Sequence, residues 1–350
     1  MKTASSRAVG AKPLVTIKDV ALAAGVSVAT VSNVVNGRKG AVGEVTRAKV
    51  QQQIERLAYR PQSTGRGLRN ARFNAVSILI IDEERSYLSN PFVGSVVAGL
   101  TEALNSSGFL AVLHGSPRGS LEDAMVIKQF GVDGLCVVLS GSTKQRLSLT
   151  QRLMTLGQPL VFIQESQPLP EGDLCVVRQD DLDGGRQLGE HLIERGCRNV
   201  VAVLPSLEWP ALQARVAGVR QAMARAKPKG KVKVVAAETE DFASVVKAVD
   251  RHLDAAPLPD AFVCGNDQLA IATMQTVKRR GHTVPADVRI TGFNAFDFWQ
   301  YTSPTITTVV SPAREIGVRA ARAMIDRLES GGFAASDIVL PVQLQRGEST

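Results

Sequence analysis

The sequence predicts an α-helical helix-turn-helix headpiece followed by a larger α/β body built on parallel sheets. Three observations point to this fold class. Positive charge is concentrated near the N-terminus, two short helical segments there are joined by a glycine-containing turn, and strand-like and helix-like segments alternate from residue 75 onward. The chain has 350 residues, enough for two or three domains. Hydrophobic residues make up 44% of it, so it can bury a sizeable core.

The net charge of +8 is distributed unevenly. Residues 1–72 contain thirteen Lys and Arg but only Asp19, Glu44 and Glu55 as acids, a net charge of +10, whereas the remainder has 28 basic and 30 acidic residues and a net charge of −2. Such a segment is typical of a protein that binds a polyanion. A solvated basic tail is the alternative, but the helical patterning of residues 15–60 favours a folded domain. Residues 1–14 lack that patterning and are expected to be disordered.

Several function classes lack their signatures. No run of about 18 apolar residues exists, and the N-terminus has no apolar segment of the secretory type, so no membrane span or export is expected. GxGxxG, Walker A, GxSxG and HExxH sequences are absent, which argues against an enzyme, a cofactor and a metal. The four cysteines are far apart, which fits reduced thiols in the cytoplasm: Cys136, Cys175, Cys197 and Cys264.

The first helix of the headpiece has clear boundary signals. Thr16 followed by Asp19 three residues later resembles a capping box. Gly25 then stands where a helix often ends in the left-handed conformation. Ser27 can cap a second helix, Val28 to Val35. Two short helices joined by such a turn match the helix-turn-helix plan, in which the second helix enters the major groove of DNA.

A third amphipathic stretch, Val45 to Leu57, completes the predicted three-helix core. On the second helix, Val31, Val34 and Val35 are expected to face this core. The outward residues are then Val28, Ala29, Ser32 and Asn33. Small and apolar side chains suit thymine methyl groups, and an asparagine can pair with adenine through two hydrogen bonds.

From Ala75 onward, apolar segments alternate with helical ones, which predicts parallel sheets covered on both faces. The expected strands are Val76–Ile81, Leu110–His114, Leu135–Leu139, Leu160–Ile163, Val200–Leu204, Val232–Ala236, Ala261–Cys264 and Ile290–Gly292. The expected helices are Phe92–Ser106, Gly184–Arg195, Arg215–Arg225, Phe242–Asp254 and Gln268–Arg280.

The headpiece closely resembles the DNA-binding signature of the LacI/GalR family of bacterial transcription regulators, the lactose-repressor-like proteins. The matching stretches are Thr16 to Ala21, Ala24 to Ser32, Asn36-Gly37 and Leu57 to Pro61. Weaker matches follow in the expected order at Cys264 to Ala270, Gly292-Phe293 and Thr307 to Val309. The resemblance covers about residues 15–350.

This resemblance implies a helix-turn-helix domain at 15–60, a hinge at 61–73 and an effector-binding and dimerisation domain at 74–350. The last domain would consist of two doubly wound subdomains of the periplasmic-binding-protein type, with a ligand cleft between them. The implied DNA contacts are Thr16, Ser27, Val28, Ala29, Thr30, Ser32, Asn33, Asn36, Tyr59 and Leu68. The family often has arginine at the position of Asn33, so base preference at that residue is not carried over.

The hinge stretch PQSTGRGLRNAR is basic, and its two glycines weaken an isolated helix by about 1 kcal/mol each. The resemblance implies a hinge helix that forms on the operator and inserts Leu68 into the minor groove, where an apolar wedge bends the duplex. Two such helices must meet at the operator centre, which requires a dimer. A plain flexible linker is the alternative.

The resemblance also implies a set of effector contacts: Gln164, Trp209, Arg215, Asn266 and Asn294. Arg215 begins an R-x-x-G element whose arginine grips the effector in the family, although a surface ion pair is the alternative. Asp267 is expected to cap the helix that follows it. The family commonly has aspartates where this chain has Gln164 and Asn294, so we expect an effector with negative charge or few hydroxyl donors.

Aromatic residues cluster near two of the predicted cleft loops: Trp209, Phe296, Phe298, Trp299 and Tyr301. They would either stack on an aromatic ligand or pack the subdomain core.

Together these observations predict a cytoplasmic, nucleoid-associated repressor. It would bind a palindromic double-stranded operator as a homodimer and respond to a small effector such as a sugar or sugar acid. A solute-binding receptor shares the body architecture but has no use for the basic headpiece. An α/β enzyme would need a catalytic constellation that the sequence does not contain.

Overall fold

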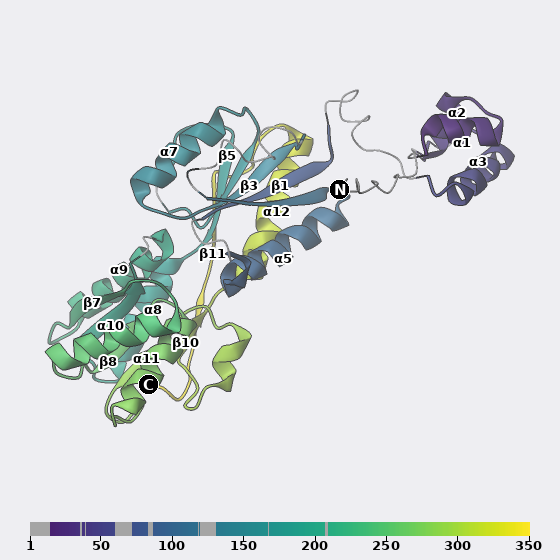
Figure 1. Ribbon diagram of the computed structural model, residues 1–350. Helices are drawn as coiled ribbons and strands as arrows, with labels where there is room; N and C mark the ends of the chain where they lie inside the picture. Colours follow the sequence, from purple (N-terminus) through teal and green to yellow (C-terminus); the bar gives the residue numbers. More distant parts are fainter. Residues whose placement is uncertain are drawn as a thin grey trace, which may run out of the picture. The chain divides into compact units, whose positions relative to one another are not determined.

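The computed structural model describes residues 15–350 except 36, 39, 60–71, 83–86, 118, 120–130, 167 and 207–208. The chain divides into two compact units, with the division between Phe73 and Asn74 (Figure 1).

The first unit contains a three-helix domain formed by α1 (Ile17–Ala24), α2 (Val28–Val35) and α3 (Glu44–Arg56). α1 and α2 meet at 107°, an angle typical of a helix-turn-helix. The three helices share a small buried core of Val20, Ala21, Ala24, Val31, Val34 and Val50. The expected bounds of the second and third helices are confirmed to within one residue.

The boundary signals of the headpiece act as the sequence predicts. Thr16 and Asp19 form a reciprocal capping box at the start of α1. Gly25 ends α1 in the left-handed conformation, with φ 63°. Ser27 Oγ accepts a hydrogen bond from Thr30 N at 3.1 Å, which caps the start of α2.

The second unit contains two parallel sheets, each covered by helices on both faces (Figure 1). The sheet of the N-terminal subdomain has the strand order β11-β5-β4-β3-β1-β2, with every pairing parallel. Its strands are β1 (Ala75–Ile81), β2 (Leu110–Ser116), β3 (Gly134–Leu139), β4 (Leu160–Ile163), β5 (Leu174–Gln179) and β11 (Asp337–Leu340). The order reverses at β1, which makes this a doubly wound sheet.

The sheet of the C-terminal subdomain repeats this plan with the order β7-β6-β8-β9. Its strands are β6 (Asn199–Pro205), β7 (Lys231–Ala237), β8 (Ala261–Cys264) and β9 (Arg289–Thr291). α8 (Asp181–Glu194) and α9 (Pro210–Arg225) pack against one face, and α10 (Phe242–Ala255) and α11 (Asp267–Arg279) against the other.

The chain passes between the two subdomains three times: from β5 into α8, from β10 (Thr308–Val310) into α12 (Ala313–Ser330), and from β11 to β12 (Gln343–Gln345). β10 and β12 pair in antiparallel fashion. The N-terminal subdomain therefore combines the chain before α8 with α12 and β11, and β12 returns to the C-terminal subdomain.

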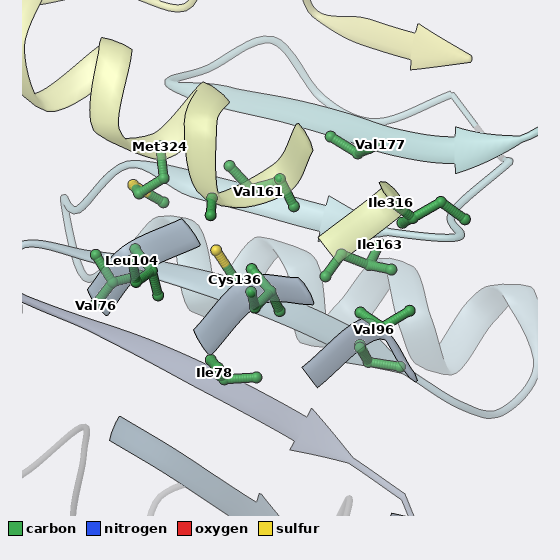
Figure 2. Packing of buried hydrophobic residues seen from close by; sticks show 14 of the residues in the cluster. Val76, Ile78, Val96, Leu104, Cys136, Val161, Ile163, Val177, Ile316 and Met324 are labelled. Carbon is green, nitrogen blue, oxygen red and sulfur yellow. The ribbon is translucent and has the colours of Figure 1, made fainter. Parts of the chain in front are cut away.

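In the N-terminal subdomain, α5 (Pro91–Ser106) and α12 cover one face of the sheet, and α7 (Thr143–Met154) lies on the other. Figure 2 shows Ile78, Cys136 and Val161 of the strands facing the helix residues Val96 and Ile316. All five side chains are buried, so this layer forms a continuous apolar core.

The α/β fold class predicted from the alternation is confirmed, and every expected strand and helix is present. The expectations missed β5, β10, β11, β12, α7 and α12. β10, β11 and β12 have only three or four residues, and α12 is rich in charged residues on its outer face. The helix expected to start at Gly184 begins at Asp181, and the one expected at Arg215 begins at Pro210.

Within the described residues, no single helix is long and apolar enough to cross a membrane; only α1 and α2 taken together, across their bend, meet the length and composition criterion. Among the described residues, no three or more His, Cys, Asp or Glu side chains lie together so that they could hold a metal ion. The four cysteines are free and buried.

α5 and α12 approach each other through two glycines. A Cβ at Gly99 would overlap the backbone carbonyl of Arg314, and one at Gly317 would overlap that of Val96. We expect Gly99→Ala to lower the free energy of unfolding of the body by about 1–3 kcal/mol, because the helices must separate. Gly94→Ala on the same helix is the control, since its Cβ would lie 3.6 Å from the Leu88 carbonyl oxygen, an ordinary contact. Equal denaturation midpoints for the two variants would contradict this packing.

Candidate functional site

The outer face of α2 presents a small surface opposite the headpiece core. Val28 is 42% exposed and Ala29 is exposed, while Ser32 and Asn33 are half-buried. These side chains are short, so the helix backbone could approach base edges closely.

The other predicted DNA contacts of the headpiece lie at helix ends. Thr16, Ser27 and Thr30 stand at the N-termini of α1 and α2, where backbone N–H groups favour a phosphate. Tyr59 is half-buried and packs against the headpiece core. Asn36, Leu68 and nearly all of the expected hinge fall outside the described residues.

Exposed cations accompany these helix ends. Lys18, Arg38 and Lys49 are exposed, and the Arg47 guanidinium donates to the Arg38 carbonyl oxygen at 2.8 Å. The headpiece therefore combines a narrow reading surface with positive charge around it, the arrangement expected of a DNA-binding domain.

The five predicted effector residues all line one cleft between the two subdomains. Gln164 comes from the N-terminal subdomain, and Trp209, Arg215, Asn266 and Asn294 come from the C-terminal one. The cleft lies at the carboxyl ends of the strands, where the strand order of each sheet reverses and ligands of doubly wound folds bind.

Eight further residues line the cleft and were not predicted as effector contacts: Asn90, Phe92, Val93, Val138, Ala211, Leu212, Glu240 and Gln268. The sequence carried a signal for one of them. Asn90-Pro91 marks a helix start, and Asn90 does cap α5. The remaining residues carried no local signal.

Arg215 is buried in the cleft wall and holds several partners at once. Its Nε donates to Asp181 Oδ1 at 2.8 Å, and the two side chains are only 7% and 8% exposed. Nη1 donates to the Gly265 carbonyl oxygen at 2.5 Å, and Nη2 to Asn294 Oδ1 at 3.4 Å. The guanidinium also lies 3.7 Å from the centre of the Phe293 ring. Arg215 is therefore a buried, paired residue of the cleft and not a surface ion pair.

Two glycines bring Asp181 and Arg215 together. A Cβ at Gly185 of α8 would overlap the Arg215 carbonyl, and a Cβ at Gly218 of α9 would overlap that of Leu182. The helices that carry the ion pair can approach closely only because both positions lack a side chain. This explains the glycine of the R-x-x-G element.

The amides at Gln164 and Asn294 differ in what they do. Gln164 Nε2 donates to Asp181 Oδ2 at 3.0 Å and its Oε1 accepts from Gln179 N at 2.8 Å, so Gln164 positions Asp181. Asn294 Oδ1 accepts from Arg215, which leaves its NH₂ group as a donor for a ligand. Both residues have positive φ, 60° and 104°, an uncommon conformation that clusters at functional sites.

The prediction that Asp267 caps α11 is wrong, because that helix begins at Asp267 and its cap is Asn266. Asn266 Oδ1 accepts from Leu269 N at 2.9 Å. Asp267 instead accepts from Thr308 Oγ1 at 2.6 Å and from Phe296 N at 3.3 Å, so it supports the loop that carries Asn294. Burial raises its pKa to about 7, against the lowering effect of these donors.

The aromatic residues fall into two groups. Trp209 and Phe296 line the cleft and pack against the core of the N-terminal subdomain. Phe298 packs against Phe296, with 6.2 Å between the ring centres, and Tyr301 is 85% exposed. Core packing is therefore present for Trp209 and Phe296, and stacking of an aromatic ligand on them stays a prediction.

Comparison with known proteins agrees with this geometry. Residues 16–62 match the profile of bacterial regulatory proteins of the lacI family, and residues 190–350 match that of the periplasmic binding protein-like domain. The chain therefore joins a lacI-family helix-turn-helix domain to a periplasmic-binding-protein-like domain. Its headpiece match coincides with the described helix-turn-helix, and its second match contains Arg215, Asn266 and Asn294.

The chain is similar to the HTH-type transcriptional regulator DegA of Bacillus subtilis strain 168, with 29% identity over 96% of this chain and 98% of the relative. A solved complex of the transcriptional regulator CelR with cellobiose has a TM-score of 0.70 and 27% identity, covering 96% and 99% of the two chains. A Lac repressor dimer bound to operator and the anti-inducer ONPF has a TM-score of 0.84 at 21% identity, over 96% and 99%, and so shares the fold.

The buried Asp267 gives the body a specific pH dependence. Its folded-state pKa of about 7 lies above the ordinary value of 3.8, so folding favours the protonated form. The contribution of Asp267 to the free energy of unfolding is therefore fully present below about pH 4 and is lost as the pH rises towards 7. We expect Asp267→Asn to become more stable relative to wild type over that range, as measured by denaturant unfolding.

The control for this experiment is Asp287→Asn. The hydrogen bonds from Thr283 lower the pKa of Asp287, so its difference from wild type should be flat from pH 5 to 8. Parallel curves for the Asp267 variant and this control would contradict the assignment.

Proposed function

We propose that this protein is a cytoplasmic, metabolite-controlled transcriptional repressor that binds a palindromic operator as a homodimer. The observation that carries this proposal is that one chain combines a basic helix-turn-helix headpiece with a cleft between two doubly wound subdomains. A change of the cleft on ligand binding would alter how the headpieces are presented to DNA.

The competing functions lack support in the described residues. A solute-binding receptor would use the cleft but not the headpiece. An enzyme would need a nucleophile together with an acid or base arranged around a substrate. Arg215 of the cleft wall is already paired with Asp181, and Glu240 is the one acid among the described lining residues. Relatives such as DegA and CelR bear the names of transcriptional regulators. We therefore infer a binding role without catalysis.

A sugar is the effector class that we favour. Polar side chains and aromatic rings line the same cleft, and a sugar uses both its hydroxyl groups and its apolar ring face. The similar CelR structure contains cellobiose. The NH₂ groups of Asn266 and Asn294 would donate to ligand oxygens, because their carbonyl oxygens already accept other hydrogen bonds.

The edge of the N-terminal sheet supports dimerisation. β2 is an edge strand, and it exposes Leu110 by 61% and Leu113 by 38%. An exposed apolar edge strand is ordinarily covered by a partner. A second copy fits the requirement, since two headpieces are needed to read a palindrome.

The first test is operator binding. A gel-shift titration with a palindromic operator selected from a random library should give two protomers per site. The logarithm of affinity should fall steeply with the logarithm of salt concentration, because the +10 segment displaces counterions from phosphates. Binding of one protomer, or affinity independent of salt, would refute the proposal.

The second test concerns the hinge. Leu68→Ala should weaken binding to the selected operator at least tenfold but leave binding to random DNA nearly unchanged, because a wedge contributes only where the central base step kinks easily. Gln62→Ala is the control, since it changes the same stretch without removing an apolar wedge. An equal loss on both DNAs would assign Leu68 to a plain linker.

A further inference from the structure

The ion pair at the inner end of the cleft, Arg215 with Asp181, has no net charge. Arg215 is the only arginine or lysine among the described residues that line the cleft, and Asp181 neutralises it at 2.8 Å. Both side chains are more than nine-tenths buried, so solvent screens the pair very little. The expectation of an anionic effector assumed that the charge of Arg215 was available, and the structure removes that basis.

Three side chains donate hydrogen bonds to the Asp181 carboxylate. Oδ1 accepts from Arg215 Nε and from Gln179 Nε2, each at 2.8 Å, and Oδ2 accepts from Gln164 Nε2 at 3.0 Å. Gln179 Oε1 in turn accepts from Ser311 Oγ at 2.6 Å. These hydrogen bonds hold the Asp181 carboxylate against the Arg215 guanidinium.

A hollow that adjoins the cleft is rich in acidic side chains. It shares Asn90, Val93, Trp209, Glu240 and Gln268 with the cleft. Its described lining contains four acids and no lysine or arginine: Asp82, Glu238, Glu240 and Asp241. An anion in the cleft would therefore lie beside acidic side chains and meet a positive group that is already paired.

We propose that Asp181 determines the charge specificity of the site: it acts as the fixed counter-ion of Arg215, and the effector is an uncharged polar molecule that accepts hydrogen bonds at its inner end. This inference rests on the proposed function for the existence of an effector. The inner end of the ligand meets the NH₂ groups of Asn266 and Asn294, and its apolar face meets Trp209 and Phe296.

The charge of the site can be tested before the effector is known. Trp209 lines the cleft and is one of only two tryptophans, so intrinsic fluorescence reports occupancy, with Trp209→Phe as the control for the signal. The probes are acetate, D-gluconate and D-glucuronate, each at constant ionic strength, with D-glucose and cellobiose as neutral counterparts. Full-length wild type should show no saturable response to the three anions.

Asp181→Asn should gain a saturable response to the anions, because Arg215 then lacks its counter-ion. The gain should disappear in the double variant D181N/R215Q. Asp183→Asn is the matched control, since this carboxylate lies on the same turn of α8 but pairs with Arg186 and not with Arg215. It should behave as wild type. If D181N does not fold, Asp181→Ser serves as the second variant, because serine is well tolerated in the first turn of a helix.

Saturable binding of an anion to wild type that is lost in Arg215→Gln would overturn the inference. So would a folded Asp181 variant that gains no anion affinity. Operator binding is measured separately on the same proteins. Loss of operator binding in wild type would refute the proposed function and leave the charge test intact, so the two failures are distinguishable.

Discussion

The buried ion pair between Arg215 and Asp181 is the interaction on which the cleft depends. A guanidinium in a cleft wall costs several kcal/mol to desolvate unless a carboxylate accompanies it. Here the carboxylate comes from the first turn of α8 and the guanidinium from α9. The pair also holds the loops at Gly265 and Asn294 through the other nitrogens of Arg215, so one arginine organises three segments of the cleft.

The same pair is connected to two of the crossings between the subdomains. Gln179 ends β5 just before the first crossing, and Ser311 lies just after β10 at the second. Their side chains bond to each other, and Gln179 bonds to Asp181. A ligand that changes the position of Arg215 or Asn294 would therefore act on residues next to the crossings, which supplies a physical connection between effector binding and movement of the subdomains.

The two subdomains use the same device to pack their helices. Gly99 and Gly317 allow α5 and α12 to touch along their backbones, and Gly185 and Gly218 do the same for α8 and α9. Side chains at these positions would separate the helices. In the C-terminal subdomain, that separation would also pull Asp181 away from Arg215. The geometry of the ion pair therefore depends on the close packing of α8 and α9.

The sequence alone determined the headpiece and the fold class. Capping at Thr16, the left-handed Gly25 and the core residues Val31 and Val34 follow from interactions within a few residues, which local patterns report well. Tertiary structure alone decided the partner of Arg215 and the supporting role of Gln164. Those contacts join residues 15 to 79 positions apart, and Arg215 and Asp181 come from different helices. Sequence spacing could name the cleft residues but could not show that a carboxylate 34 positions away already balances the arginine.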